Sequence, residues 1–428
     1  MRKGFIFNHN KCVGCNACSA ACILENKWTI HSRKVITFSS VALPELLITN
    51  LSIACNHCDM AVCLEGCPSS SYHREQLTGA IVIDESKCIG CKYCQWNCPY
   101  DAPQFDLEKR IIGKCNLCFS GVIKGGLPAC TTACPTGALN YGELSEPVCK
   151  NIFTWFPDKN LNPAIEFKGN RNNIPLRIIP ENIFDSAQPG SSVKKRNGIT
   201  GNYSLVAFSF LTTLSVAMII SSLITGIFPD RILLLFLIAM AGFMSLFHLG
   251  KKLRAWRAFV NLKKSPLSRE VTMFILFSLV SSCTVCYQIP QLIVVSGITG
   301  LVLLFLIDSV YIYSDDRKQV RMHSGQTFIS ALLIVSFISG IIMPFLFLAI
   351  IKLALSVYAL SVNRKNSIPF GIRFFRIAIL LVTGASIISE ISYPDPAIIS
   401  LFLTGEFLDR VIFYVDFKPL NINSLINH

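Results

Sequence analysis

The sequence is short of charge and of histidine, and both shortages limit what the chain can be. Only 15% of its 428 residues are charged, 52% are hydrophobic, and histidine occurs seven times. The N-terminal stretch MRKGFIFNHNKC has neither an apolar core long enough for a signal peptide nor a twin arginine, so we expect no export signal. No nucleotide or pterin fingerprint is found either, and we therefore expect substrate chemistry to take place on another chain.

The net charge of +13 raises the question of a nucleic-acid partner. The basic residues cluster in loops beside long apolar runs, however, which is the distribution that the positive-inside rule describes for membrane proteins. We therefore expect a lipid bilayer to be the partner of these charges and expect no nucleic acid.

Cysteine, in contrast, is abundant, and sixteen of the 19 cysteines fall into four groups. In a chain without an export signal, thiolates held by metal in a reducing compartment fit better than disulfides. The groups are Cys12, Cys15, Cys18 and Cys22; Cys55, Cys58, Cys63 and Cys67; Cys88, Cys91, Cys94 and Cys98; and Cys115, Cys118, Cys130 and Cys134.

The spacing within these groups indicates iron–sulfur clusters. The first and third groups read C-x2-C-x2-C-x3-C, in which three cysteines bind one [4Fe–4S] cluster and the fourth reaches a neighbouring cluster. Structural zinc, the alternative, is typically held by pairs of cysteines around one ion. We predict four [4Fe–4S] clusters in two ferredoxin-like units of two clusters each. The spacing alone leaves open which groups pair.

The three cysteines outside the groups are interpreted differently. Cys149 is expected to be a packed thiol. Cys283 and Cys286 lie in an apolar run, where small apolar fillers are a better interpretation than a redox pair.

The chain changes character near residue 200. Residues 1–185 are polar and cysteine-rich, residues 186–203 are expected to form a flexible basic linker, and residues 204–428 contain long apolar runs. Near the end of the first part, IEFKGN and LRIIP are predicted to be short strands. The predicted fold class is an α+β ferredoxin-like iron–sulfur domain followed by an all-α polytopic membrane bundle of about eight transmembrane helices.

The apolar runs are long enough to cross a bilayer, which takes roughly 20 residues of helix. With a break near Gly340 and Pro344 there are eight runs, and fifteen basic residues then lie on the iron–sulfur side against Arg231 alone on the other. This predicts a multi-pass protein of the inner (cytoplasmic) membrane whose termini and iron–sulfur domain face the cytoplasm. The predicted spans are residues 204–228, 232–250, 271–289, 292–312, 327–342, 344–362, 374–391 and 397–414. The fifteen basic residues are Lys251, Lys252, Arg254, Arg257, Lys263, Lys264, Arg269, Arg317, Lys318, Arg321, Arg364, Lys365, Arg373, Arg376 and Lys418.

Charged residues inside spans are costly and are candidates for function, with ion pairing or snorkelling as the alternative. A neutral histidine helped by a carboxylate suits the proton-accepting role beside a quinol hydroxyl, although a helix-end histidine can also be purely structural. A haem with two axial histidines needs a pair within the spans, and only His248 lies in an apolar run, so we expect no haem. The charged residues in the spans include Asp308, Lys352, Glu406, Asp409 and Arg410. The candidate quinol-binding residues are His248, Asp308, Glu406 and Arg410.

These motifs resemble those of a known family. Residues 1 to about 185, with CNHCDMAVCLEGCP and CIGCKYCQWNCPYDAPQFD, are similar to the four-cluster electron-transfer subunit of the dimethyl sulfoxide reductase family of molybdoenzymes. From Tyr203 onward, HLGKKLRAWRAFVNLKKSPLSRE and GEFLDRVIFY are similar to the eight-span anchor of the same enzymes, which oxidises menaquinol. The chain therefore resembles a fusion of the two subunits. Ala61 stands where the family usually has proline, a departure that we expect to leave ligation unaffected.

The resemblance implies a pairing, a cluster type and a function. It pairs the first cysteine group with the fourth and the second with the third. It implies four cubane clusters, because Cys91 stands where relatives with a three-iron cluster lack the cysteine. It implies an oxidoreductase subunit of anaerobic respiration that takes electrons from the quinone pool near His248 and passes them to a separate molybdopterin catalytic subunit. Reverse flow from a soluble donor to quinone and a structural or assembly scaffold are the alternatives.

Overall fold

In the computed structural model of the protein, the described residues are 2–39, 48–145, 156, 160–169, 203–314, 323–362, 370–388 and 395–417. They form two compact units. The first contains the described residues up to 169 together with Leu253–Ser265, and the second contains the described residues of 203–252 and 266–417. The linker expected at residues 186–203 stays a prediction, because nearly all of it lies outside the described residues.

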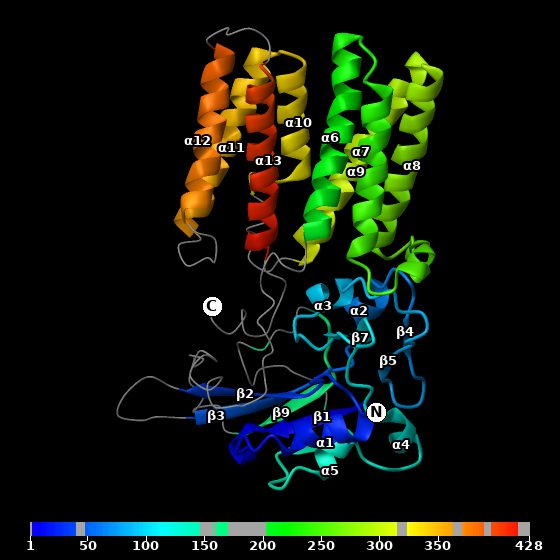
Figure 1. The fold of residues 1–428 in the computed structure, drawn as a ribbon. Coiled ribbons are helices and arrows are strands. Elements are labelled where there is room, and N and C mark those ends of the chain that lie inside the picture. The colour runs from blue at the N-terminus through cyan, green and yellow to red at the C-terminus, as the bar shows by residue number, and fades with distance from the viewer. Residues whose placement is uncertain are drawn as a thin grey trace. The chain divides into compact units, whose positions relative to one another are not determined.

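The first unit is built from short strands and short helices (Figure 1). Its elements are β1 (Lys3–Asn8), η1 (His9–Lys11), α1 (Ala17–Asn26), β2 (Lys34–Ser39), β3 (Ile48–Ile53), α2 (Val62–Glu65), β4 (Tyr72–Arg74), β5 (Ile81–Ile83), α3 (Tyr93–Asn97), β6 (Gln104–Asp106), β7 (Ile111–Gly113), α4 (Phe119–Ile123), α5 (Ala129–Thr132), β8 (Leu139–Glu143) and β9 (Ile165–Lys168). In the described residues β1 pairs antiparallel with β8 and parallel with β9, while β2–β3, β4–β5 and β6–β7 form antiparallel pairs.

The three-stranded sheet joins the beginning of the cysteine-rich region to its end. In β1 the side chains of Phe5 and Phe7 enter the core with 2% and 0% exposure, because alternate residues of a strand face the same side. The strand predicted in IEFKGN is confirmed as β9, where Ile165 pairs with Phe5. The second predicted strand, LRIIP, lies outside the described residues. Strands from both ends of the cysteine-rich region thus meet in one sheet.

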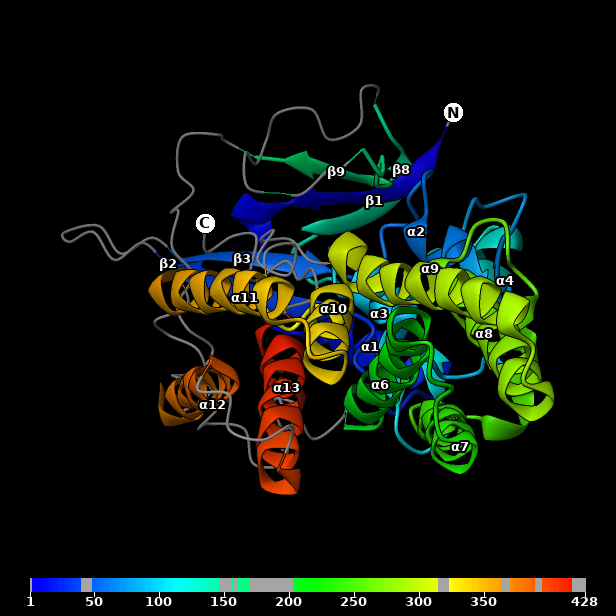
Figure 2. The same cartoon turned by 90° about the horizontal axis from the view of Figure 1, so that it is seen from above.

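The described part of the second unit consists of eight helices (Figure 2). Helix α6 packs against α7, α9 and α10, α8 packs against α9, and α12 packs against α11 and α13. Their bounds are α6 (Tyr203–Thr225), α7 (Arg231–Phe247), α8 (Pro266–Tyr287), α9 (Pro290–Ser314), α10 (Thr327–Ile338), α11 (Ile342–Val362), α12 (Phe370–Ile388) and α13 (Pro396–Asp416). A 3-10 helix, η6 (Lys252–Phe259), follows α7.

Several of these helices can span a membrane. Among the described residues four are long and apolar enough, namely α6, α8, α9 and α11, and a fifth is added if α7 and η6 count as one broken span. Helix α10 is apolar but has 12 residues, roughly 18 Å, against a hydrocarbon core of roughly 30 Å. The helices are consistent with membrane association, and the expected number of eight spans stays a prediction.

Two expectations about the spans are tested directly by the helix bounds. The break expected near Gly340 is confirmed, because α10 ends at Ile338, α11 begins at Ile342 and Gly340 has a φ of 66°. The assignment of Arg373 and Arg376 to a loop is wrong, because both lie inside α12 with 7% and 2% exposure. Carboxylates of α13 pair with both guanidinium groups, and these ion pairs offset the cost of removing the two charges from water.

Candidate functional site

The four cysteine groups share one backbone turn. The residue before the second cysteine of each group has a positive φ: 71° at Gly14, 44° at His57, 70° at Gly90 and 63° at Leu117. A left-handed conformation costs a residue other than glycine roughly 1–2 kcal/mol. Its presence at His57 and Leu117 therefore indicates that the same loop shape is required in all four groups, whichever residue occupies the turn.

The fourth cysteine of the third group lies with the second group. Cys55, Cys58, Cys63 and Cys98 line one small cavity of about 20 Å³. The thiol of Cys58 also interacts electrostatically with those of Cys55, Cys98 and Cys63. Three cysteines of one group and one of another thus surround a common space.

In the other groups, too, the fourth cysteine lies with three cysteines of a different group. The Cys91 and Cys94 thiols interact with that of Cys67, the Cys12 thiol with that of Cys134, and the Cys22 thiol with those of Cys118 and Cys130. We name the four sets by number. Site I is Cys12, Cys15, Cys18 and Cys134; site II is Cys115, Cys118, Cys130 and Cys22; site III is Cys55, Cys58, Cys63 and Cys98; site IV is Cys88, Cys91, Cys94 and Cys67.

The thiols of each site are arranged as cluster ligands would be. Each cysteine of a cubane cluster binds a different iron, so that its four thiolates surround a volume. The four cysteines of site III line a common cavity in this way. In the described part of the chain no three Cys, His, Asp or Glu side chains converge on a position for a single metal ion.

Burial also affects the ionisation of a thiol at site II. Burial, opposed by the positive charge of Arg33, raises the pKa of the Cys22 thiol to about 12. A metal is bound by the thiolate, and iron would supply the charge that makes loss of the proton favourable.

Arg33 lies between sites I and II, and its side chain is 1% exposed. Its guanidinium donates to the Ser52 hydroxyl at 3.1 Å and lies 4.4 Å from the centre of the Phe5 ring. Its Nε and Nη2 have no hydrogen-bond partner among the described residues. Buried donors of this kind need an acceptor, and a cluster with four thiolate ligands carries the negative charge that would satisfy them.

Lys114 is the second buried cation, at the wall of the site III cavity. Burial lowers the pKa of its ammonium group, but the Cys55, Cys63 and Cys115 thiols outweigh burial and hold the pKa above its ordinary value. These thiols belong to sites II and III, so that Lys114 stands between the two.

The segment Leu253–Ser265, which carries four of the basic residues expected on the iron–sulfur side, belongs to the first unit. Arg254 donates to the carbonyl of Cys88 at 3.1 Å, and the Asn261 amide donates to the carbonyl of Cys67 at 2.9 Å. Both of these cysteines are members of site IV. The segment is therefore hydrogen-bonded to the backbone of site IV, in addition to carrying basic residues that bear on the membrane orientation.

The candidate quinol residues are not gathered at one point. His248 is partly buried and caps the C-terminus of α7. Asp308 and Arg410, on α9 and α13, form a buried ion pair at 3.3 Å. Glu406, one turn earlier on α13, is buried and paired with Lys352 of α11.

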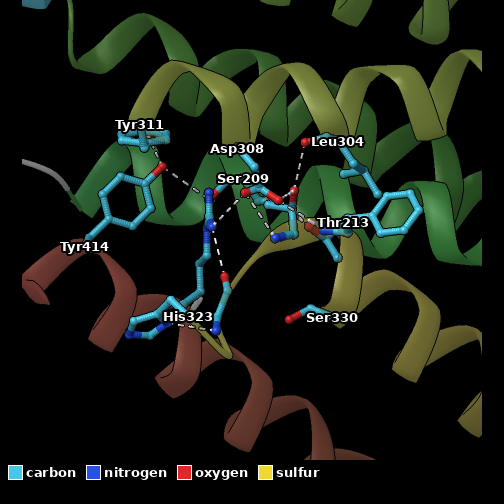
Figure 3. A network of polar contacts seen from close by, with 12 residues as sticks. Ser209, Thr213, Leu304, Asp308, Tyr311, His323, Ser330 and Tyr414 are labelled. Atoms are coloured by element: carbon cyan, nitrogen blue, oxygen red, sulfur yellow. Dashed lines mark hydrogen bonds and ion pairs between the residues drawn. The ribbon is translucent and has the colours of Figure 1, made fainter. Parts of the chain in front are cut away.

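Asp308 is held by several donors. It accepts hydrogen bonds from the Thr327 backbone N–H at 3.2 Å and hydroxyl at 2.9 Å, and from the Phe328 N–H at 3.3 Å. Arg410 in turn donates to the Ser209 hydroxyl at 2.9 Å, within the network of Figure 3. Asp308 therefore stabilises the N-terminus of the short helix α10, a structural role that competes with quinol binding.

A second set of buried charges surrounds α13, and the sequence indicated it only in part. Lys352 contacts Asp409 at 3.1 Å, and Arg376 contacts Asp409 at 2.6 Å. Near the end of α13, Asp416 pairs with Arg373 and, at 3.3 Å, with His323. His323 and Asp416 stand outside the predicted spans, and only the periodic placement of charges on α13 could have indicated the cluster.

Two of the remaining cysteines lie on α8, in the second unit. Cys283 and Cys286 are exposed on α8, so the interpretation as interior fillers is wrong, since neither fills space between helices. Cys149 lies outside the described residues.

Comparison with known proteins identifies the cysteine-rich region. Residues 47–144 match the family described as 4Fe-4S dicluster domain. The sequence is 35% identical over 153 residues to one chain of the anaerobic dimethyl sulfoxide reductase of Escherichia coli (strain K12), a match that covers 33% of this protein and 74% of the relative. It is 32% identical over 161 residues to the thiosulfate reductase electron transfer subunit of Salmonella typhi, covering 36% and 82%. It is 32% identical over 154 residues to one subunit of the tetrathionate reductase of Salmonella typhimurium, covering 34% and 60%.

Proposed function

Because this protein is a member of the family of iron–sulfur electron-transfer subunits of anaerobic reductases, we propose that it carries electrons from menaquinol through four [4Fe–4S] clusters to a separate catalytic subunit. The observation that carries the proposal is the exchange of each fourth cysteine between groups. This arrangement is the ligand pattern of two-cluster ferredoxins. Sites I and II would form one pair of clusters, and sites III and IV the other.

The contacts between sites support a single line of four clusters. Arg33 interacts with cysteines of sites I and II, and the Cys115 thiol of site II interacts with the Cys55 thiol of site III. The phenol of Tyr72 interacts with Cys63 of site III and Cys94 of site IV. Each site thus has its neighbour in the order I, II, III, IV. When bound, each cluster takes up and passes on one electron.

The protein's own residues would hold and tune this line. The sixteen cysteine thiolates are the proposed ligands, and backbone N–H groups of Ser71, Leu117 and Leu139 lie 3.4 Å from the sulfurs of Cys67, Cys115 and Cys134. Hydrogen bonds to ligand sulfurs are one of the means by which a protein sets a cluster's reduction potential.

Electrons would enter from a quinol held in the second unit near His248. Arg254 follows His248 by six positions, and it contacts the backbone of site IV. This supports site IV as the first acceptor. Asp308, Glu406 and Arg410 stay candidates for the quinol site, although each is engaged in an ion pair. We further propose that the chain has eight membrane spans and that its iron–sulfur domain faces the cytoplasm. The partner subunit is proposed to contain a molybdopterin cofactor.

Metal analysis of the full chain tests the proposal. Purified without oxygen in detergent, the chain is expected to contain roughly 16 iron atoms, four for each site, together with an equal amount of acid-labile sulfide. A larger subunit that contains molybdenum is expected to co-purify. Zinc in place of iron, or iron without sulfide, would contradict cluster ligation. Co-purification with a partner that contains no molybdenum would contradict the proposed acceptor alone.

A further inference from the structure

Lys114 occupies an unusual position in the first unit. It follows β7 directly, precedes the site II ligand Cys115, and has only 1% of its surface exposed. Its side chain lines the cavity that the four cysteines of site III surround. A lysine is rarely buried to this degree unless its charge has partners.

The partners of the Lys114 amino group are all acceptors. It donates to the carbonyl oxygen of Ile81 and, at 2.9 Å, to the carbonyl oxygen of Cys115. Its side chain lines the same cavity as Cys55, with whose thiol it interacts electrostatically. An ammonium group has three N–H donors and no acceptor, so two carbonyl acceptors and a neighbouring thiol favour the charged form. The site therefore contains a fixed positive charge.

This charge lies at the junction between the two pairs of sites. Cys55, on one side, belongs to site III, and Cys115, on the other, belongs to site II. Arg33, the other buried cation of this region, interacts instead with cysteines of sites I and II. An electron that moves through the four sites in the proposed order passes Lys114 between site III and site II.

We propose that Lys114 is a positioning residue for electron transfer, which holds up the reduction potentials at sites II and III and thereby keeps the crossing between the two cluster pairs favourable. The reason is electrostatic: one electron added on either side increases the negative charge near a buried ammonium group, and low-dielectric surroundings strengthen that attraction. One electron leaves site III as one arrives at site II, and no proton is transferred. The inference rests on the proposed function, since it requires clusters at both sites.

The test compares Lys114→Gln, which removes the charge, with Lys114→Arg, which keeps it. Lys109→Gln is the matched control, because Lys109 is half-exposed and pairs with Glu85 in the same unit. The full chain is purified in detergent, its iron is counted, and the midpoint potential of each cluster is measured by redox titration followed by electron paramagnetic resonance. Signals are assigned to sites with one cysteine-to-serine variant for each site.

Lys114→Gln is expected to weaken electron binding at sites II and III at least tenfold, a fall of about 59 mV for a one-electron couple. Sites I and IV should shift less, and Lys114→Arg and Lys109→Gln should leave all four potentials near those of the unaltered protein. Iron lost from Lys114→Gln but retained in Lys114→Arg also supports the role of the charge, because arginine keeps the positive charge that glutamine lacks.

Two results would overturn the inference. Unchanged potentials in a fully loaded Lys114→Gln protein would remove the electrostatic role. Equal loss of iron from the Gln and Arg variants would make Lys114 a packing residue. Failure of the proposed function looks different, because the unaltered chain would then lack four-iron clusters from the outset.

Discussion

Replacement of Lys352 by methionine tests the buried ion network of the second unit. Lys352 is 0% exposed and donates to the Ser330 hydroxyl at 2.8 Å. It pairs with Glu406 and Asp409, while Arg376 pairs with Asp409. These four ionised groups sum to zero charge, and Lys352→Met leaves one negative charge in excess in a buried setting.

The size of the effect follows from that imbalance. Removing one partner of a buried pair costs about 3–5 kcal/mol, because the remaining charge stays desolvated without compensation. For a unit of 150–250 residues a loss of 1 kcal/mol lowers the melting temperature by about 2–4 °C, so about 4 kcal/mol corresponds to about 8–16 °C. The double variant Lys352→Met with Glu406→Gln restores the balance, and we expect it to recover at least half of the loss.

Thermal unfolding of the full chain in detergent, followed by far-ultraviolet circular dichroism, measures this difference through the helices. The conservative control is Ser356→Ala, which removes a neutral partner of Arg376 and should lower the melting temperature by only a few degrees. A Lys352→Met protein that melts within 2–3 °C of the unaltered chain would refute the reasoning, since the charges would then be solvated.

Three further predictions concern the cysteine sites and the quinol site. Cys98→Ser should abolish the same paramagnetic signal as Cys55→Ser, because both residues line one cavity, and loss of the Cys88 signal instead would contradict the exchange of ligands. Asn261→Ala removes the side-chain hydrogen bonds to the carbonyls of Glu65 and of the site IV residue Cys67, about 1–3 kcal/mol in all, and should increase proteolysis of residues 253–265 relative to the exposed control Leu253→Ala. Equal cleavage of the two variants would contradict a role of these bonds in holding the segment. His248→Ala should abolish quinol-dependent cluster reduction with iron content unchanged, and undiminished reduction would exclude His248 from the site.

The sequence predicted features that depend on local spacing. The cysteine groups, the break at Gly340 and the strand β9 are each determined by a few neighbouring residues, and the structure has the expected elements at each place. The left-handed turn was predictable where glycine occupies it, at Gly14 and Gly90. At His57 and Leu117 the residue type gives no signal, and only the repeated cysteine spacing relates the four turns.

Features that depend on packing between distant residues were not predictable from the sequence. Arg373 and Arg376 read as loop charges, because a single sequence does not show that Asp416 and Asp409 lie opposite them. Lys114 and Arg33 likewise look like ordinary surface residues, although each is 1% exposed. In each case a carboxylate or thiol from another segment determines where the charge can lie.

Quinol-driven reduction of the clusters tests the central claim most directly. The full chain, purified without oxygen and oxidised, is mixed with a menaquinol analogue, and the reduced clusters are counted by electron paramagnetic resonance. The proposed electron path predicts that each quinol oxidised delivers two electrons to the clusters, and that His248→Ala prevents this. Clusters that stay oxidised in the presence of quinol, although dithionite reduces them, would contradict it.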